Sequence, residues 1–169
     1  MKFFIIGYMY SGKSTVGKQL AKKLKFDFLD TDIYFEEHYQ TSISEYFAKY
    51  GEPAFRTAER KILEDLQSYP NNAIISTGGG FPCFNNNMEL MKEMGVVIYL
   101  EASVGAIYKR FEKSTVQRPL LKGLSKEEAI CKISNQLAER EVFYKQANVT
   151  LSAENVNFEA LLQVLGPFL

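Results

Sequence analysis

The chain has 169 residues, of which 46% are hydrophobic and 24% are charged, an ordinary composition for a globular protein with a core. Lys and Arg together number 20, as do Asp and Glu, so no net charge favours nucleic acid or an anionic membrane as a partner. No apolar run approaches the ~20 residues of a membrane span, and we expect no signal peptide before the first predicted strand.

The first predicted elements are an apolar strand over residues 2–6 and a helix over residues 13–24, with a glycine-containing loop between them. The loop fits the phosphate-binding Walker A pattern G-x-x-x-x-G-K-[ST]. Strand, loop and helix in this order suit phosphate binding, because backbone N–H groups and the helix dipole then face the phosphates. The residues predicted to bind the phosphates of ATP are Gly7, Tyr8, Met9, Tyr10, Ser11, Gly12, Lys13, Ser14 and Thr15.

Within this loop, two side chains have specific predicted roles. Lys13 is expected to reach the β- and γ-phosphates, and the Ser14 hydroxyl is expected to bind Mg²⁺. A second strand is predicted over residues 27–29, and Asp30-Thr31-Asp32 follows it. One carboxylate could hold a metal-bound water while the other accepts a hydrogen bond from a hydroxyl about to be phosphorylated. The alternative is a helix N-cap with its usual acidic residues.

A long helix is predicted over residues 42–68, and it carries Phe55-Arg56-x-x-Glu59. Arg56 and Glu59 are three residues apart, so they could form an ordinary surface ion pair. Alternatively, Arg56 could bind a substrate carboxylate through its planar guanidinium group, with Glu59 orienting it. The helix begins with a capping box, Ser42-x-x-Glu45, and a second capping box stands at Ser125-x-x-Glu128.

A third strand is predicted over residues 73–76, and it opens into Thr77-Gly78-Gly79-Gly80. Three glycines in a row carry a large cost in conformational entropy, which a plain turn rarely needs. Close approach of backbone N–H groups to a ligand would explain them, and a flexible loop is the alternative.

The rest of the chain continues the alternation of helices and strands. Strands are predicted over residues 96–100 and 148–151, and helices over residues 86–94, 104–113, 126–145 and 158–165. This alternation predicts a parallel sheet covered by helices on both faces, with ligands at the carboxyl ends of the strands. That edge would bring the glycine loop, Asp30–Asp32 and the three glycines to one site.

Two further arginines are candidates for this site. Arg140 occupies a position on its helix where the pattern expects an apolar residue, and a buried arginine needs an anionic partner, either a structural carboxylate or a ligand. Arg118 lies in a polar stretch over residues 112–123 that is predicted to be a loop. In a lid beside a phosphate loop, Arg118 could close over the γ-phosphate.

Taken together, these motifs resemble those of the shikimate kinase family, over nearly the whole chain. The resemblance implies an α/β, three-layer P-loop kinase fold of the nucleoside-monophosphate-kinase type, with a five-stranded parallel sheet of order 2-3-1-4-5 and a lid. It implies ATP-dependent phosphorylation of the 3-hydroxyl of shikimate, with Mg²⁺ as cofactor. The residues implied to bind shikimate are Asp32, Arg56, Gly78, Gly79, Gly80 and Arg140.

The resemblance also assigns roles outside the shikimate site. Lys13, Asp32 and Arg118 would be catalytic, and Arg110 would stack on adenine. Ser14 and, through a water, Asp30 would hold the metal. We expect one domain over residues 1–169, with a substrate-binding helical region at about 31–60 and a lid at about 112–123.

Two other classes of protein fit the sequence less well. Another small-molecule kinase, acting on gluconate or a nucleoside monophosphate, is the second possibility, and the arginine pair and the three glycines argue against a nucleotide as its acceptor. A GTPase switch is expected to carry N-K-x-D, which this sequence lacks. Cys83 and Cys131 form no Cys-x-x-Cys motif, so we expect reduced thiols in a cytoplasmic protein. We expect a monomer, with shikimate and ATP as its partners and neither nucleic acid nor a membrane.

Overall fold

The computed structural model describes residues 1–114, 121 and 123–169. Its sheet has the order β2-β3-β1-β4-β5, and every neighbouring pair is parallel. The strands are β1 (Lys2–Ile6), β2 (Asp27–Asp30), β3 (Ala73–Ser76), β4 (Gly95–Glu101) and β5 (Val149–Ser152). This arrangement confirms the predicted fold class and strand order.

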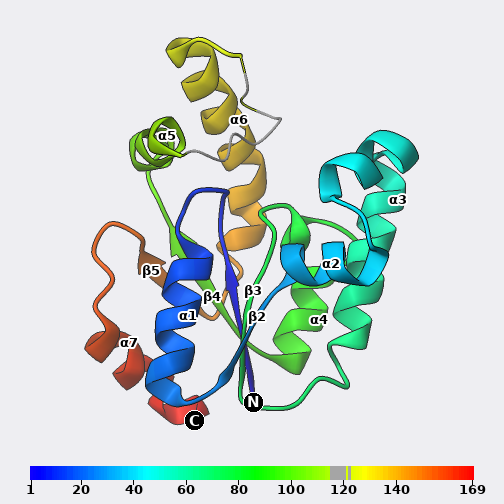
Figure 1. Ribbon diagram of the computed structural model, residues 1–169. Helices are drawn as coiled ribbons and strands as arrows, with labels where there is room; N and C mark the ends of the chain where they lie inside the picture. The colour runs from blue at the N-terminus through cyan, green and yellow to red at the C-terminus, as the bar shows by residue number, and fades with distance from the viewer. Residues whose placement is uncertain (115–120, 122) are drawn as a thin grey trace.

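Helices cover the sheet on both sides, with α1 and α7 on one side and α3 and α4 on the other (Figure 1). The α-helices are α1 (Lys13–Leu24), α2 (Thr31–Tyr39), α3 (Ile43–Asp65), α4 (Asn87–Met94), α5 (Val104–Lys113), α6 (Lys126–Tyr144) and α7 (Phe158–Leu165). Short 3₁₀ helices are found at η1 (Phe81–Cys83) and η3 (Gly166–Phe168). No helix in this described part of the chain is long and apolar enough to cross a membrane.

The helix boundaries agree with the predictions to within one residue except at α2 and α3, and α3 ends at Asp65 rather than at residue 68. Helix α2 lies within the helical region expected at about residues 31–60 but was given no bounds of its own, and it begins after the N-cap Asp30. The predicted continuous helix over residues 42–68 is interrupted at Gly51, which has a φ of 78°, and Pro53 follows it. A left-handed residue breaks the helical hydrogen-bond ladder, and proline cannot donate to it. Both predicted capping boxes are present, at Ser42 with Glu45 and at Ser125 with Glu128.

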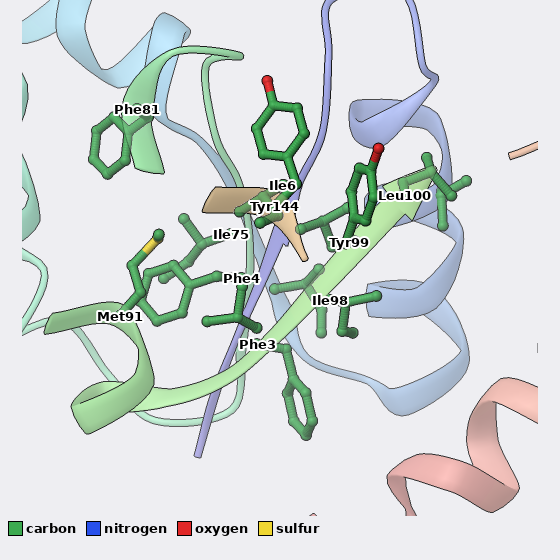
Figure 2. Close-up of a cluster of buried hydrophobic side chains, with 14 of the residues drawn as sticks. Phe3, Phe4, Ile6, Ile75, Phe81, Met91, Ile98, Tyr99, Leu100 and Tyr144 are labelled. Atoms are coloured by element: carbon green, nitrogen blue, oxygen red, sulfur yellow. The ribbon is translucent and has the colours of Figure 1, made fainter. Parts of the chain in front are cut away.

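The core forms on both faces of the central strand β1, whose residues are all buried. Figure 2 shows that Phe3 and Phe4 point to opposite sides of the strand, and that Phe4 points toward Met91 of α4. On the other side, the rings of Phe3 and Phe26 lie 6.1 Å apart. A strand that is apolar on both faces is typical of a central parallel strand, and it fixes the edge where the first loop emerges.

The start of β4 gives a test of this packing. An ideal β-carbon on Gly95 would lie 2.0 Å from the carbonyl oxygen of Lys2, so no side chain fits there without moving β1 away. We expect Gly95→Ala to lower the free energy of unfolding by at least about 2 kcal/mol. Gly105→Ala is the matched control, because Gly105 is an exposed residue of α5 with no atom within 4 Å of its β-carbon position. It should be neutral or stabilise by up to ~1 kcal/mol. Urea unfolding measures both, and a Gly95→Ala protein as stable as wild type would contradict this packing.

Candidate functional site

The phosphate loop after β1 depends on two glycines in backbone conformations with positive φ. Gly7 has a φ of 145° and Gly12 a φ of 98°. A β-carbon on Gly7 would lie 2.6 Å from the carbonyl oxygen of Leu100, so the loop also needs Gly7 for its close contact with β4. The turn is closed by the Ser11 N–H, which donates to the Tyr8 carbonyl at 3.1 Å. These constraints hold the loop at the N-terminus of α1, as phosphate binding requires.

Two cationic side chains contact the backbone of this loop. The ammonium group of Lys13 is nearly buried and donates to the Tyr8 carbonyl at 2.9 Å. The guanidinium group of Arg110, on α5, donates to the carbonyl oxygens of Tyr10 at 3.1 Å, Ala153 at 2.9 Å, and Ser11. Arg110 therefore joins α5, the phosphate loop and the loop after β5, which is the region where an adenine ring was predicted to bind.

Asp30 is both a helix cap and the partner of a phosphate-loop hydroxyl. One carboxylate oxygen accepts from the Asp32 N–H at 3.0 Å and caps α2. The other accepts from the Ser14 hydroxyl at 2.6 Å, and the Ser76 hydroxyl lies 3.3 Å from that of Ser14. The N-cap alternative is therefore correct in geometry and leaves the second oxygen directed at the phosphate loop.

This set of oxygen atoms fits Mg²⁺. Carboxylate and hydroxyl oxygens are hard ligands, and Mg²⁺ is usually held by one or two carboxylates together with phosphate oxygens and waters. Among the described residues, no group of three or more His, Cys, Asp or Glu side chains could hold a metal ion. A metal at Ser14 and Asp30 would thus take the rest of its ligands from phosphate oxygens and waters.

The three glycines after β3 each make room for a different charged side chain. A β-carbon on Gly78 would lie 2.6 Å from Oδ1 of Asp32. On Gly79 it would lie 3.2 Å from Nη1 of Arg140, and on Gly80 it would lie 2.7 Å from Nη1 of Arg56. The turn thus brings together an acid and two arginines from three distant parts of the chain.

The expected role of the glycine N–H groups needs a correction at one position. The N–H of Gly78 donates to the Thr31 hydroxyl at 3.1 Å, so it is already paired within the protein. Thr31 is buried, and it was not predicted as a site residue. Its place between two aspartates at a strand end was the signal available, because a threonine hydroxyl can accept from a nearby backbone N–H.

Arg56 and Glu59 do not form the surface ion pair that was the alternative prediction. Nη1 of Arg56 donates to Glu59 at 2.7 Å, and the exposed fractions of the two side chains are 12% and 6%. Nε and Nη2 of Arg56 donate to Glu52 at 3.2 and 3.0 Å. The guanidinium carbon lies 4.2 Å from the ring centroid of Phe84, a cation–π contact that the motif alone did not predict. The guanidinium plane is therefore fixed on several sides.

Burial raises the pKa of Glu59 to about 7, because the buried carboxylate loses its hydration. The positive charge of Arg56 and the hydrogen bond from it lower this pKa, but they offset the burial only in part. Burial also raises the pKa of the Cys83 thiol to about 11, so this cysteine is a protonated thiol at neutral pH. The positive charges of the nearby Arg140 and Arg56 lower this pKa in part.

Arg140 is half-buried on α6 and contacts both the glycine turn and the phosphate loop. Its guanidinium carbon lies 5.5 Å from the ring centroid of Tyr8. No carboxylate within the described part of the chain forms an ion pair with it, but its positive charge lowers the pKa of Glu59, so this buried carboxylate interacts with it electrostatically. The Tyr144 hydroxyl, one turn further along α6, donates to the Gly79 carbonyl at 2.6 Å.

The predicted lid residue Arg118 lies outside the described residues. Helix α5 extends to Lys113, and so takes up the first two residues of the predicted lid. Leu121, in the same polar stretch, is buried.

The parallel sheet of this order, with the phosphate loop after β1, defines the class of P-loop kinases. The shikimate kinase family model matches residues 9–165. The shikimate kinase of Azobacteroides pseudotrichonymphae is 40% identical over 98% of both chains. The crystal structure of the shikimate kinase from Bacteroides thetaiotaomicron superposes with a TM-score of 0.94, at 34% identity and 98% coverage of both chains. The chain belongs to the shikimate kinase family, as the motifs predicted.

A solved structure from this family carries shikimate. It is the shikimate kinase from Acinetobacter baumannii in complex with shikimate, with a TM-score of 0.85 at 31% identity over 98% of this chain and 93% of that one. The chain is accordingly a kinase by family.

The raised pKa of Glu59 predicts how stability depends on pH. The folded protein binds this proton more tightly than the unfolded chain, in which a glutamate has its ordinary pKa of 4.5. The stabilising contribution is therefore fully present below pH 4.5 and is lost as the pH rises through about 7. We expect Glu59→Gln to flatten the fall in the free energy of unfolding between these two pH values. Urea unfolding across that range checks this, with Glu64→Gln on exposed α3 surface as control. Equal slopes for wild type and Glu59→Gln would contradict it.

Proposed function

We propose that this chain transfers the γ-phosphoryl group of ATP to the 3-hydroxyl of shikimate, giving shikimate 3-phosphate and ADP in aromatic amino acid biosynthesis. The observation that carries the proposal is the glycine turn, which gathers Asp32, Arg56 and Arg140 beside the phosphate loop. One acid and two arginines suit a small substrate with a hydroxyl and a carboxylate. The family match and the relative solved with shikimate support the same reaction.

Arg56 and Arg140 are proposed to bind the shikimate carboxylate. A guanidinium group has five N–H donors, and three of those of Arg56 have partners among the described residues. One N–H on each of its two terminal nitrogens is left, which suits a carboxylate. Because Glu52 and Glu59 already fix the plane of Arg56, little side-chain entropy is lost when a ligand binds. Gly78, Gly79 and Gly80 are proposed to line the substrate ring.

Asp32 is proposed to bind the 3-hydroxyl and to accept its proton as the hydroxyl oxygen attacks the γ-phosphorus. In this step a new oxygen–phosphorus bond forms, and the bond between the γ-phosphorus and the bridging oxygen of ADP breaks. The loop over residues 7–15 and Lys13 would hold the phosphates and balance their charge. Lys13 would exchange its hydrogen bond to the Tyr8 carbonyl for a phosphate oxygen.

Mg²⁺ is proposed to bind at the Ser14 hydroxyl and, through a water, at Asp30. When bound, it would neutralise charge on the β- and γ-phosphates. The distance of 2.6 Å between Ser14 and Asp30 supports this, since the two oxygens are already oriented toward one another.

The remaining assignments are proposals made from the family resemblance. Arg110 would stack on adenine, and its contacts with three backbone carbonyls would fix its plane. Arg118 would stabilise the transferring phosphoryl group from a lid at about residues 112–123. We propose one domain over residues 1–169, a substrate-binding region at about residues 31–60, a monomer, and the cytoplasm as the location, where ATP is abundant.

The proposed reaction can be tested with purified protein, ATP, Mg²⁺ and a panel of acceptors. The panel holds shikimate, gluconate and the nucleoside monophosphates, and ADP release is measured for each. Of the acceptors in the panel, we expect only shikimate to be phosphorylated. In Lys13→Met the rate of this reaction should fall by at least about a thousandfold, because the cation of the phosphate loop is then missing. Lys18→Met, on the same helix but exposed, is the control. Faster phosphorylation of gluconate or of a nucleoside monophosphate than of shikimate would contradict shikimate as the acceptor.

The two aspartates after β2 should differ in their effects. Asp32→Asn keeps the shape but cannot take the proton, so we expect kcat to fall by roughly 10²–10⁴ at any Mg²⁺ concentration. Asp30→Asn should instead raise the Mg²⁺ concentration needed for half-maximal rate, with kcat largely restored at high Mg²⁺. Thermal unfolding verifies that both proteins are folded. If added Mg²⁺ rescues Asp32→Asn and not Asp30→Asn, the two roles are reversed.

A further inference from the structure

Tyr8 is a large aromatic residue at a position where the phosphate-loop pattern specifies nothing. Its backbone would serve the phosphates in the proposed function, but its side chain is directed elsewhere. The residue is only 1% exposed, and its hydroxyl donates to Oε1 of Gln136 on α6 at 2.6 Å. The ring therefore lies in one fixed place between the loop and α6.

Arg140 is four residues after Gln136, so the two side chains project from the same face of α6. The distance of 5.5 Å from the Arg140 guanidinium carbon to the centroid of the Tyr8 ring lies within the ~6 Å of a cation–π contact. Tyr8 is thus the cation–π partner of Arg140 among the described residues, and no described carboxylate forms an ion pair with it. Arg56 is different, because Glu52 and Glu59 hold it in place.

The same face of α6 is fixed to the glycine turn. The Tyr144 hydroxyl donates to the Gly79 carbonyl at 2.6 Å, and Gly79 leaves the space that Nη1 of Arg140 occupies. Burial raises the pKa of the Tyr144 hydroxyl, and the charge of Arg140 and a hydrogen bond with it lower that pKa in part. Two tyrosines therefore lie near the guanidinium group of Arg140. The hydroxyl of Tyr144 is hydrogen-bonded to the glycine turn, and the ring of Tyr8 forms the cation–π contact.

We propose that Tyr8 is a positioning residue for shikimate, acting through Arg140. Its ring holds the guanidinium group at the glycine turn, where the group can meet the substrate carboxylate. This inference rests on the proposed function. It assigns to a phosphate-loop side chain a role in the acceptor half of the reaction, separate from the contact of its backbone carbonyl with Lys13.

The test compares Tyr8→Leu with Tyr8→Phe. Leucine removes the ring, and we expect the KM for shikimate to rise about five- to tenfold, the size of a partly buried cation–π contact. The KM for ATP should change by less than about twofold, because the Tyr8 carbonyl remains. Phenylalanine keeps the ring, and the half-exposed Gln136 can turn to water, so the KM for shikimate should stay within about twofold of wild type.

Tyr10→Leu is the matched control, since it also removes a ring from the same loop. The Tyr10 ring packs against Phe111 of α5, with centroids 5.7 Å apart, whereas the cation–π contact of Arg140 is with Tyr8. Whatever it does to ATP use, Tyr10→Leu should not raise the KM for shikimate. Tyr8→Met fills the space with a flexible chain and serves as the second ring-free variant should Tyr8→Leu unfold.

Three results would overturn the inference. One is an unchanged KM for shikimate in a folded ring-free variant. A second is Tyr8→Phe being as impaired as Tyr8→Leu, which would assign the effect to the hydroxyl. A third is an equal rise of both KM values, which would mean a general disturbance of the loop. Failure of the proposed function is distinct, because wild-type protein would then show no turnover with shikimate.

Discussion

The site depends on how closely the turns after β1 and β3 approach each other at the carboxyl edge of the sheet. These two strands are paired, so their turns emerge side by side. A β-carbon on Gly79 would lie 3.3 Å from the Met9 nitrogen, which is tighter than side chains normally tolerate. Glycine therefore allows the donor and acceptor halves of the site to adjoin. In-line phosphoryl transfer needs that proximity, since most of its catalysis is positioning.

The second constraint is the burial of charge at this edge. Arg56 and Glu59 are removed from water, and isolated charges so placed would cost several kcal/mol each by general estimates. Mutual hydrogen bonding and the Phe84 ring offset part of that cost, while the raised pKa of Glu59 reflects what remains. The cost of ordering the Arg56 side chain is therefore met when the protein folds. A carboxylate that binds there, as proposed, would meet a guanidinium group that is already ordered.

The strands and the phosphate loop could be predicted because apolar runs and a dense motif are local signals. The bounds of helix α2 could not, since it buries only Thr31 and Phe35 and shows no apolar stripe. The break in α3 was not predicted, because the residues on both sides of Gly51 follow a helical pattern. The three glycines were predicted to allow close approach of a ligand. In the structure, the groups that lie close to them include the side chains of Asp32, Arg56 and Arg140. These contacts join distant segments of the chain, so no local sequence pattern could predict them.

The groups expected to meet ligands already have internal partners, and this bears on specificity. Lys13 donates to a loop carbonyl, and Ser14 donates to Asp30. Binding of a nucleotide would exchange these hydrogen bonds, so each new one adds little net free energy. Arg140 differs, because it forms a cation–π contact with Tyr8 and no ion pair with a described carboxylate, although its charge lowers the pKa of Glu59. With Arg140 as the proposed carboxylate ligand, an acceptor without a carboxylate would remove water from this cation without replacing the lost hydrogen bonds, and that penalty would disfavour it.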